Sequence, residues 1–577
     1  MTNAANVPLD RTLEELAALA AIRGDAAEAA CYMRATALVR EWHIGSDADL
    51  DVLFDQPSFP GHDSDRDVIA RLRQMYDAGA WVFVESAIAD LPADLRWLFE
   101  SGAVTIEELA RLHKALGVVT ASDLADAVER QAVRGVLDVE REYRIAAALF
   151  DLRAAIPRVP LGRAVAMVDA VLGRLRAVPG VEWAAPVGSL RRGQDTVGDV
   201  EVVAAATNPS AAIDEIAQLP GVGRTLHRSE RRLYVTIDRV QVGLRCPEPS
   251  HAGAQLLQLT GSYPHLNALR EVARARGGRL TSDGYFPPGG GAVVAAREPD
   301  IYAALGLPFI PPEIRNGDGE VDAARAGRLP ALVARDDIRG DLHMHTNWSD
   351  GRDTSDAMVA MFRSLGYAYL AITDHSPMAQ TTRTLTIDGV RRQAEEIAAL
   401  RERFPELTIF HGCEVEILPD GRLDLPDRVL EQLDIVLASL HERAGHGPDQ
   451  LLRRYLSAVR HPLVNVITHP TNRLLPQRPG YELDYDRLFE VAIETGTIVE
   501  IDGAPAHLDM DGALARRAVG AGVTVTIDSD AHRAELLDRQ MHLGVTTARR
   551  GWVEPRHVVN TRSAADVRAL VARKRQG

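Results

Sequence analysis

The first 150 residues show the hydrophobic spacing of helices. Apolar residues recur at intervals of three and four in LEELAALAAI (residues 13–22) and in TIEELARLHKALGVV (residues 105–119). This period places the apolar side chains on one face of a helix. Because no low-complexity linker interrupts the region, we predict a helical domain over residues 1–150.

The spacing changes after residue 150. A further amphipathic helix is predicted over residues 160–176, and short apolar runs typical of strands follow it. These runs are VEWAAPV, VGDVEVVAAA, RLYVTI and RVQVGLRC, with the helix-like AAIDEIAQL between them. We predict an α+β domain over residues 151–248, a compact unit over 249–315 and a linker over 316–338.

Strands that end in polar residues alternate with helices over residues 339–577. The strand-like runs are YLAITDHS, LTIFHGCEVEIL, IVLASLHE, NVITHPTNR, TIVEIDG and VTVTIDSDAH. Such alternation is typical of parallel βα units that form a barrel or an open sheet. The polar residues stand at the carboxyl ends of the strands, where these folds place their chemistry.

Composition narrows the class of protein. A chain of 577 residues is too long for one core, and three or four domains are expected. No apolar run is long enough to span a bilayer and no signal-peptide pattern opens the chain, so we expect a cytoplasmic protein without a membrane partner. The three cysteines are odd in number and far apart, which argues against disulfides and thiolate zinc sites.

Ligand-type side chains cluster at the ends of the predicted strands. Imidazole combined with carboxylate suits zinc, manganese or iron. Several ions together are a common device for hydrolysing phosphate esters. A single histidine at a strand end would more simply be an ordinary polar residue, but the repetition at successive strand ends favours a metal site. The nine candidate metal ligands are His343, His345, Asp350, His375, Glu414, His441, His469, Asp530 and His532.

The motifs GDLHMHT, ITDHS and SDAH resemble the PHP (polymerase and histidinol phosphatase) domain. The resemblance implies a distorted (βα)7 barrel with a centre of two to three Mn, Zn or Fe ions. Glu414 would bridge two of them, and Arg473 would be either a phosphate-facing arginine or a solvated loop residue. Glu416, Asp502 and His507 depart from the family pattern. The implied ion sites are His343, His345, Glu414 and Asp530; Glu414, His441 and His469; and Asp350, His375 and His532.

The motif VGSLRRGQDTVGDVEVV resembles the nucleotidyltransferase signature of family X DNA polymerases. The resemblance implies a palm over 151–248 and a thumb over 249–315, with Gly188, Ser189 and Arg192 around a nucleotide phosphate. Such a palm needs three carboxylates for its Mg ions. The matching positions hold Asp199, the longer Glu201 and Gly243, which has no side chain. We therefore predict a degenerate nucleotide-binding site in which template-directed synthesis is weak or lost.

The N-terminal region lacks features that the resemblance would imply. The stretches FESGAVTIEEL and VRGVLDVEREY stand where helix-hairpin-helix turns with glycine-flanked hairpins are expected, so the DNA-binding region is degenerate. No lysine precedes Lys114, which argues against a Schiff-base lyase. Leu266 replaces an expected asparagine in the thumb.

These features favour a metal-dependent DNA phosphoesterase of DNA repair, most simply a 3′–5′ exonuclease acting on 3′ ends, gaps or single strands. Three alternatives stay open. They are an active DNA polymerase with PHP proofreading, a small-molecule phosphatase, and a DNA-end binding protein without turnover. The net charge of −16 does not favour DNA binding by bulk charge, although local basic strips and bound cations can attract DNA.

Overall fold

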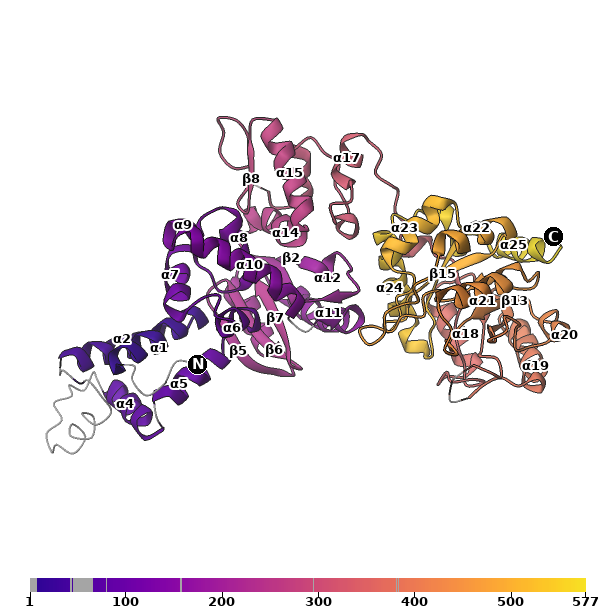
Figure 1. The fold of residues 1–577 in the computed structure, drawn as a ribbon, viewed down its shortest axis with the longest axis horizontal. Helices are drawn as coiled ribbons and strands as arrows, with labels where there is room; N and C mark the ends of the chain where they lie inside the picture. The colour runs from indigo at the N-terminus through magenta and orange to yellow at the C-terminus, as the bar shows by residue number, and fades with distance from the viewer. Residues whose placement is uncertain are drawn as a thin grey trace.

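The computed structural model of the chain describes residues 8–41, 44, 66–78, 80–155, 158–293, 295–379, 381 and 383–576. Part of the predicted helical domain 1–150 therefore lies outside the described residues. The chain forms three lobes in a row, with the helical region at one end, the palm and thumb in the middle and a barrel at the other end (Figure 1). Among the described residues, no helix combines the length and apolarity needed to cross a membrane.

The helical region packs around a shared apolar core that includes Leu13 and Leu16. Threonines begin two of its helices. Thr105 and Thr120 each accept a backbone hydrogen bond from the third helical residue, whose carboxylate caps the threonine N–H in return. The helices are α1 (Leu9–Arg23), α2 (Ala26–Glu41), α4 (Arg66–Ala78), α5 (Ala80–Ala89), α6 (Ala93–Glu100), α7 (Ile106–Leu116), α8 (Ala121–Glu129), α9 (Val133–Val136) and α10 (Val139–Ala155).

The palm is a five-stranded sheet in the order β2-β4-β7-β6-β5. Helices α11 and α13 pack on it, and β4 runs parallel to β7. The register places Glu201 of β4 beside Gly243 of β7. The elements are β1 (Val159–Pro160), α11 (Leu161–Ala177), β2 (Val181–Pro186), α12 (Gly188–Arg191), β3 (Thr196–Val197), β4 (Val200–Ala206), α13 (Pro209–Ala217), β5 (Val222–Arg228), β6 (Arg232–Ile237), β7 (Val240–Arg245) and η3 (Pro249–His251).

The thumb has its own core, in which the fully buried Arg315 forms an ion pair with Glu298 and lies over the ring of Tyr302. A buried guanidinium requires such partners. The elements are α14 (Ala252–Thr260), α15 (Tyr263–Ala275), β8 (Arg279–Thr281), β9 (Gly284–Phe286), α16 (Glu298–Ala304) and η4 (Pro312–Ile314), followed by α17 (Glu320–Arg325) and η5 (Arg335–Asp337).

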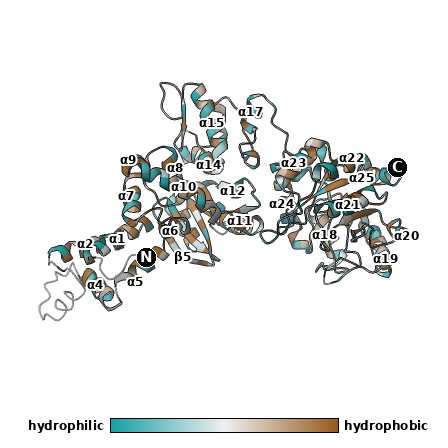
Figure 2. Cartoon of the chain, in the orientation of Figure 1, coloured by the Kyte–Doolittle hydropathy of each residue, from teal (hydrophilic) through white to brown (hydrophobic). Residues whose placement is uncertain are grey.

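The barrel has seven parallel strands in sequence order, β10 to β16. Its ends meet because His345 N–H donates to Ala531 O and Asp530 N–H donates to His343 O, each at 3.0 Å. The barrel strands are hydrophobic, whereas the helices around them are mixed (Figure 2). The strands are β10 (Gly340–Asp341), β11 (Tyr369–Ile372), β12 (Thr408–Glu416), β13 (Ile435–Ser439), β14 (Val466–Ile467), β15 (Ile498–Asp502) and β16 (Val525–Asp528).

Helices cover the outside of the barrel, which is the arrangement predicted from the alternating sequence pattern. They are α18 (Ser355–Ser364), α19 (Ile387–Arg403), α20 (Asp427–Leu430), α21 (Pro448–Arg460), α22 (Tyr485–Thr495), α23 (Gly512–Ala521) and α24 (Leu537–Arg550), with short turns η6 (Ala534–Leu536), η7 (Pro555–His557) and η8 (Val559–Thr561). Helix α25 (Ala564–Gln576) packs instead against the other face of the strands, in a cluster with Tyr369 and Phe410.

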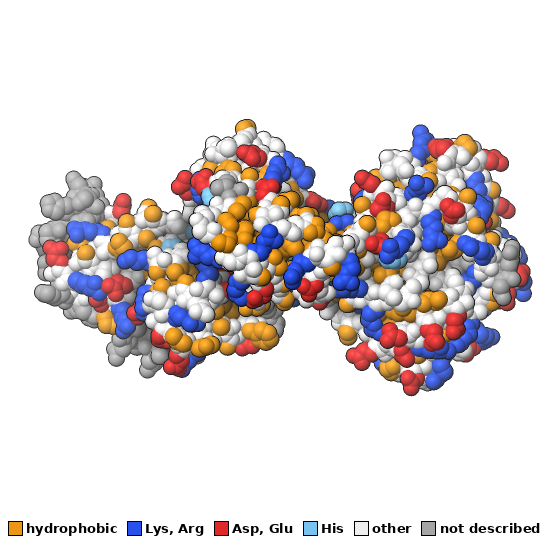
Figure 3. Space-filling view, turned by 90° about the horizontal axis from the view of Figure 1, so that it is seen from above, with side chains coloured by type: hydrophobic (Ala, Val, Ile, Leu, Met, Phe, Trp, Pro, Cys, Tyr) orange, Lys and Arg blue, Asp and Glu red, His pale blue; other side chains and the backbone are white. Residues whose placement is uncertain are grey.

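The palm touches the barrel directly across the waist seen in Figure 3. Leu508 and Leu543 of the barrel belong to the apolar core of the palm. Gly162 of α11 lies so close to Pro505 that a Cβ at position 162 would come within 2.5 Å of the proline Cβ. The contact is therefore packed apolar surface, and the linker alone does not hold the two lobes together.

One palm carboxylate adds an ionic part to this contact. Asp195 Oδ2 binds Arg473 Nη1 at 2.8 Å, and Asp195 Oδ1 pairs with Arg550. Burial acts to raise the pKa of Asp195, but Arg550 and Arg473 outweigh it and hold the pKa below its usual value. Asp195 thus joins two barrel arginines to the palm.

We expect Asp195→Asn to destabilise the contact between palm and barrel at neutral pH. The asparagine keeps the size of the side chain but removes the counter-charge that Arg550 and Arg473 share, and it leaves Arg473 the longer contact with Asp511 at 3.8 Å. Removing one partner of a buried pair costs about 3–5 kcal/mol, and partial solvent access reduces this to about 2 kcal/mol. Calorimetry should show a thermal midpoint lowered by about 5 °C.

Asp322→Asn is the matched control, since Asp322 pairs with Arg325 at 3.7 Å on the exposed surface of α17. Exposed pairs of this kind contribute little, so its midpoint should stay within about 1 °C. Equal shifts for the two variants would contradict a stabilising role for Asp195 in the interface.

Candidate functional site

The barrel brings the nine predicted ligand residues together at the carboxyl ends of its strands. Parallel strands all end on the same side of the sheet, so residues distant in sequence converge there. His343 and His345 follow β10, Asp350 lies in the next loop, His375 follows β11, Glu414 is in β12, His441 follows β13, His469 follows β14, and Asp530 and His532 follow β16.

Two ligand groups share His345. In the first, the ligand atoms of His345, Asp350, His375 and His532 all lie within 4.8 Å of one another. The second consists of His343, His345 and Asp530, with His345 Nε2 3.0 Å and His343 Nε2 3.6 Å from Asp530 Oδ1. The first group contains the predicted set of Asp350, His375 and His532. The second contains the predicted set of His343, His345, Glu414 and Asp530 except for Glu414.

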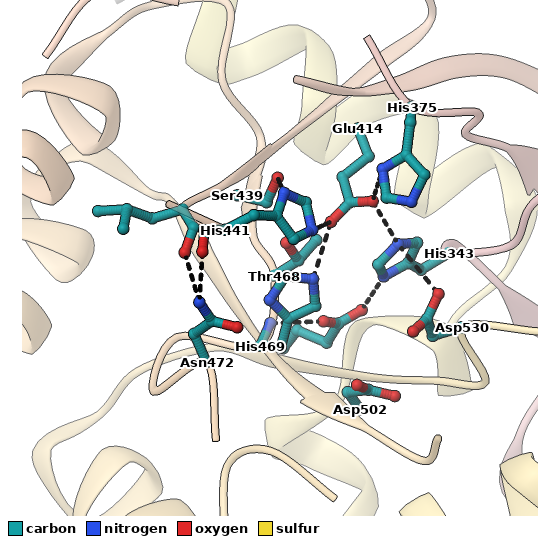
Figure 4. Close-up of polar contacts among 12 residues, drawn as sticks. His343, His375, Glu414, Ser439, His441, Thr468, His469, Asn472, Asp502 and Asp530 are labelled. Carbon is teal, nitrogen blue, oxygen red and sulfur yellow. Dashed lines mark hydrogen bonds and ion pairs between the residues drawn. The ribbon is translucent and has the colours of Figure 1, made fainter. Parts of the chain in front are cut away.

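Glu414 lies at the centre of the cluster (Figure 4). Its two carboxylate oxygens lie 2.8–3.5 Å from five imidazoles. A third ligand group joins Glu414 to His375 and His441, whereas His469 reaches Glu414 Oε1 at 2.8 Å without being a member of the group. His375 therefore stands between two groups, which differs from the predicted partition. The five imidazoles are those of His343, His345, His375, His441 and His469.

The surroundings of Glu414 favour its ionised form. Burial acts to raise its pKa, but nearby imidazoles, His375 and His343 above all, outweigh it and hold the pKa well below its usual value. Among the described residues, some buried ring nitrogens of the cluster have no hydrogen-bond partner, including His345 Nδ1 and His469 Nδ1. Buried polar atoms without partners cost free energy, so this donor set fits divalent cations.

Two glutamates orient the histidines. Glu500 in β15 is fully buried, and its Oε1 accepts a hydrogen bond from His343 Nδ1 at 2.7 Å while Oε2 accepts from the backbone N–H of His469 at 2.7 Å. Glu416 Oε2 lies 2.7 Å from His441 Nδ1. Carboxylates in this position fix the tautomer of a metal-binding imidazole. Sequence reasoning noticed Glu416 only as a departure and missed Glu500, although a carboxylate in the strand TIVEIDG must find a partner.

The structure places Arg473 at the contact between barrel and palm. Its Nε donates to His507 O at 2.8 Å, its Nη1 binds Asp195 Oδ2, and its Nη2 donates to Leu508 O. The residue is 8% exposed, so it is not a solvated loop arginine. The phosphate-facing role stays a prediction. No local sequence signal indicates the pairing with the palm.

The palm carboxylates do not form a metal triad. Glu201 Oε1 accepts hydrogen bonds from Arg245 Nε and Tyr234 Oη, each at 2.5 Å. A Cβ at Gly243 would lie 2.6 Å from the ring of Tyr234. Asp238, five residues before Gly243, lies in the turn between β6 and β7 with φ +48° and not on a strand. The space of the third carboxylate is occupied by an aromatic ring.

A cavity of about 520 Å³ nevertheless remains in the palm, and it is lined by Gly188, Ser189, Arg192, Asp199 and Glu201 among others. Its wall also includes residues of α8, so the helical region closes one side. Arg245 Nη1 binds Asp123 of α8 at 2.8 Å, which connects the helical region to the Glu201 contact. Arg192 Nη1 donates to Thr260 O at 2.6 Å. The predicted nucleotide-binding residues thus line one cavity, and the carboxylate of Glu201 is hydrogen-bonded to Arg245 and Tyr234.

Comparisons with known proteins match both halves of the chain. Residues 255–316 match the family model of the DNA polymerase beta thumb, and residues 341–504 match that of the PHP domain. The chain is 33% identical to the DNA polymerase/3'-5' exonuclease PolX of Bacillus subtilis, over 98% of each chain. It is also 28% identical to a probable phosphatase of Syntrophotalea carbinolica, over 38% of this chain and 90% of that protein. A probable phosphatase of Shewanella oneidensis is 29% identical over 34% of this chain and 76% of its own.

We expect Glu500→Gln to weaken metal binding without removing a ligand. The amide keeps one oxygen for His343 but places an NH2 group against the N–H of His469, so one of the two hydrogen bonds is lost. Changes of such outer partners lower metal affinity by about 10–100-fold. Competition with a chelator measures this change. Glu402→Gln on the exposed side of α19 is the control, and equal affinities in both variants would contradict an orienting role.

Proposed function

The chain belongs to the family X DNA polymerases that carry a C-terminal PHP domain, and we propose that its PHP barrel is a metal-dependent DNA phosphodiesterase, a 3′–5′ exonuclease, while template-directed synthesis by the palm is weak or lost. One observation carries the proposal. The nine ligand-type residues converge at one end of the barrel around Glu414.

We propose that the nine residues hold two to three Mn, Zn or Fe ions, with Glu414 and Asp530 as the catalytic carboxylates. Bound ions of this kind activate water and offset charge on the phosphate oxygens. The protein supplies the orientation, because Glu500 holds His343 and Glu416 holds His441, and the Glu414 carboxylate is fully buried. The ligand residues are His343, His345, Asp350, His375, Glu414, His441, His469, Asp530 and His532.

For the palm, we propose a nucleotide-sized cavity that no longer organises Mg ions for synthesis. Asp199 still lines the cavity, but Glu201 is held by Arg245 and Tyr234. An arginine that neutralises a carboxylate competes with any cation for it. The cavity residues Gly188, Ser189 and Arg192 would then position DNA or a nucleotide without reaction.

The substrate that follows is DNA, as 3′ ends, gaps or single strands met in repair within the cytoplasm. The Bacillus subtilis relative, a DNA polymerase/3'-5' exonuclease, supports this class. In Figure 3 acidic and basic side chains are interleaved over the visible face, which favours local contacts over binding by one broad basic surface. We also propose the domain division 1–150, 151–248, 249–315, 316–338 and 339–577.

A second candidate is a phosphatase acting on small phosphomonoesters. The relatives that support it are named probable phosphatases, and they align with about a third of this chain. The attached palm and thumb favour DNA, because a small ester needs neither. Release of mononucleotides from a labelled 3′ end, measured beside hydrolysis of a small phosphomonoester, separates the two candidates.

Glu414→Ala should abolish the exonuclease. The change removes the one carboxylate that contacts five imidazoles, so neighbouring cations would face each other without the charge between them. The rate should fall well beyond the hundredfold or so that loss of an outer partner causes, and bound metal should fall by more than one ion. The measurements are nucleotide release and elemental analysis of natively purified protein.

His375→Ala is the comparison variant, because it removes a ligand but leaves Glu414 in place. Excess Mn²⁺ should restore part of its activity and none of that of Glu414→Ala. Near wild-type nucleotide release by Glu414→Ala would show that the metal centre is not the catalyst. Wild-type protein with less than one ion, and no gain on adding Mn²⁺, would contradict the metal centre itself.

Primer extension with Mg²⁺ or Mn²⁺ should be absent or at least about a hundredfold below that of an intact family X polymerase, since misplaced catalytic groups cost on this scale. The double change Glu201→Asp with Gly243→Asp should not restore it, because the ring of Tyr234 occupies the space of the new side chain. Adding Tyr234→Ala makes room, and extension should then rise.

Asp199→Asn in that triple variant should remove any gain, which ties extension to the rebuilt carboxylates. Extension by the unmodified chain at the rate of an intact enzyme would show that the palm is active as it stands. A gain from the double change alone would show that Tyr234 does not block the site.

A further inference from the structure

A further set of ligand-type residues lies at the mouth of the barrel. Asp502 ends β15, His507 lies in the loop that follows, and Asp530 follows β16. One ligand atom of each lies within 4.8 Å of the other two. Neither Asp502 nor His507 belongs to the nine residues assigned to the proposed metal centre.

The Asp502 carboxylate is buried and only half satisfied. The residue is 0% exposed, and its Oδ1 accepts a hydrogen bond from the backbone N–H of Ala504 at 2.6 Å. Its Oδ2 is buried and has no hydrogen-bond partner among the residues that the structure describes. In Figure 4 the side chain lies beside Asp530, and no dashed contact joins it to the other residues drawn. A buried carboxylate oxygen without a donor is costly, so the position calls for a cation.

His507 has one nitrogen committed and one left over. Its Nδ1 lies 2.9 Å from the carbonyl oxygen of Arg473, which can only accept, so Nδ1 carries the hydrogen. The lone pair is then on Nε2. A ring held by an Nδ1–H bond to a backbone carbonyl is the usual arrangement of a metal-binding histidine. The ring also stacks on His469 at a centroid distance of 5.5 Å, which restricts its plane.

Asp530 can serve both groups. Its contacts with His343, His345 and His532 all involve Oδ1. A carboxylate with one oxygen directed to each of two cations can join them, and Oδ2 is the atom that remains for the Asp502 side. The two groups thus share a residue without competing for the same oxygen.

We propose that Asp502, His507 and Asp530 form an additional divalent cation site beside the proposed metal centre. Two carboxylates and one imidazole suit Mn²⁺, Fe²⁺ or Zn²⁺. Bonds of about 2.0–2.2 Å place two ligands of one ion at most about 4.4 Å apart, so the observed spacing needs only small shifts. The proposal rests on the proposed centre because Asp530 belongs to both.

The test is the number of Mn²⁺ ions that the full-length protein binds. Metal-stripped protein is titrated with Mn²⁺ in equilibrium dialysis, and bound metal is measured directly. Asp502→Asn keeps the shape and the acceptor for the Ala504 N–H but removes the charge, whereas His507→Gln removes the imidazole from a partly exposed position. Each variant should bind one ion fewer than the wild type, or bind its last ion at least about tenfold more weakly.

His251→Gln is the matched control, since it removes an imidazole from the turn before the thumb, and its Mn²⁺ binding should equal that of the wild type. Equal binding curves for wild type, Asp502→Asn and His507→Gln would overturn the additional site while leaving the centre intact. Wild-type protein that binds no Mn²⁺ would overturn the centre and this site together. If Asp502→Asn does not fold, His507→Gln alone decides between these outcomes.

Discussion

The burial of Glu414 is the constraint on which the barrel centre depends. Five imidazoles surround one fully buried carboxylate, and the interior offers no water to solvate it. Such a concentration of charge persists only when each ring is oriented from outside. Glu500 orients the ring of His343 and Glu416 that of His441, and both glutamates come from strands of the same parallel sheet. The geometry of the centre therefore depends on the order of the strands in the sheet.

The palm compensates a buried carboxylate with different partners. Its buried Glu201 is also compensated, but by Arg245 and Tyr234. An imidazole that contacts a carboxylate still has a second nitrogen for a cation, whereas a guanidinium has only donors. The barrel contacts therefore leave ring nitrogens for ions, whereas in the palm Glu201 Oε1 is already paired with the guanidinium of Arg245. Asp123 of the helical region also pairs with Arg245, so this arginine connects the palm to the helical region.

The sequence predicted the fold class and the convergence of the nine ligands because both follow from local signals. Strand-like runs that end in His, Asp or Glu require no knowledge of distant contacts. Contacts between distant segments were not predictable in this way. Arg473 was predicted to be either a phosphate-facing arginine or a solvated loop residue, and the sequence did not indicate its partner Asp195, which is 278 residues away in the palm. The ring of Tyr234 fills the space at Gly243 through strand pairing that the sequence pattern alone does not specify.

The distant contact at Arg473 also explains how a palm without a carboxylate triad stays coupled to the barrel. The guanidinium of Arg473 binds Asp195 of the palm, while its carbonyl oxygen accepts the hydrogen bond from His507 Nδ1. One residue thus connects the palm to the loop that carries His507 at the barrel mouth. This coupling uses Asp195 together with the packed apolar contacts of Leu508 and Leu543. If synthesis by the palm is weak or lost, as proposed, the structural demand on the palm is unchanged, since the barrel loop still packs against it.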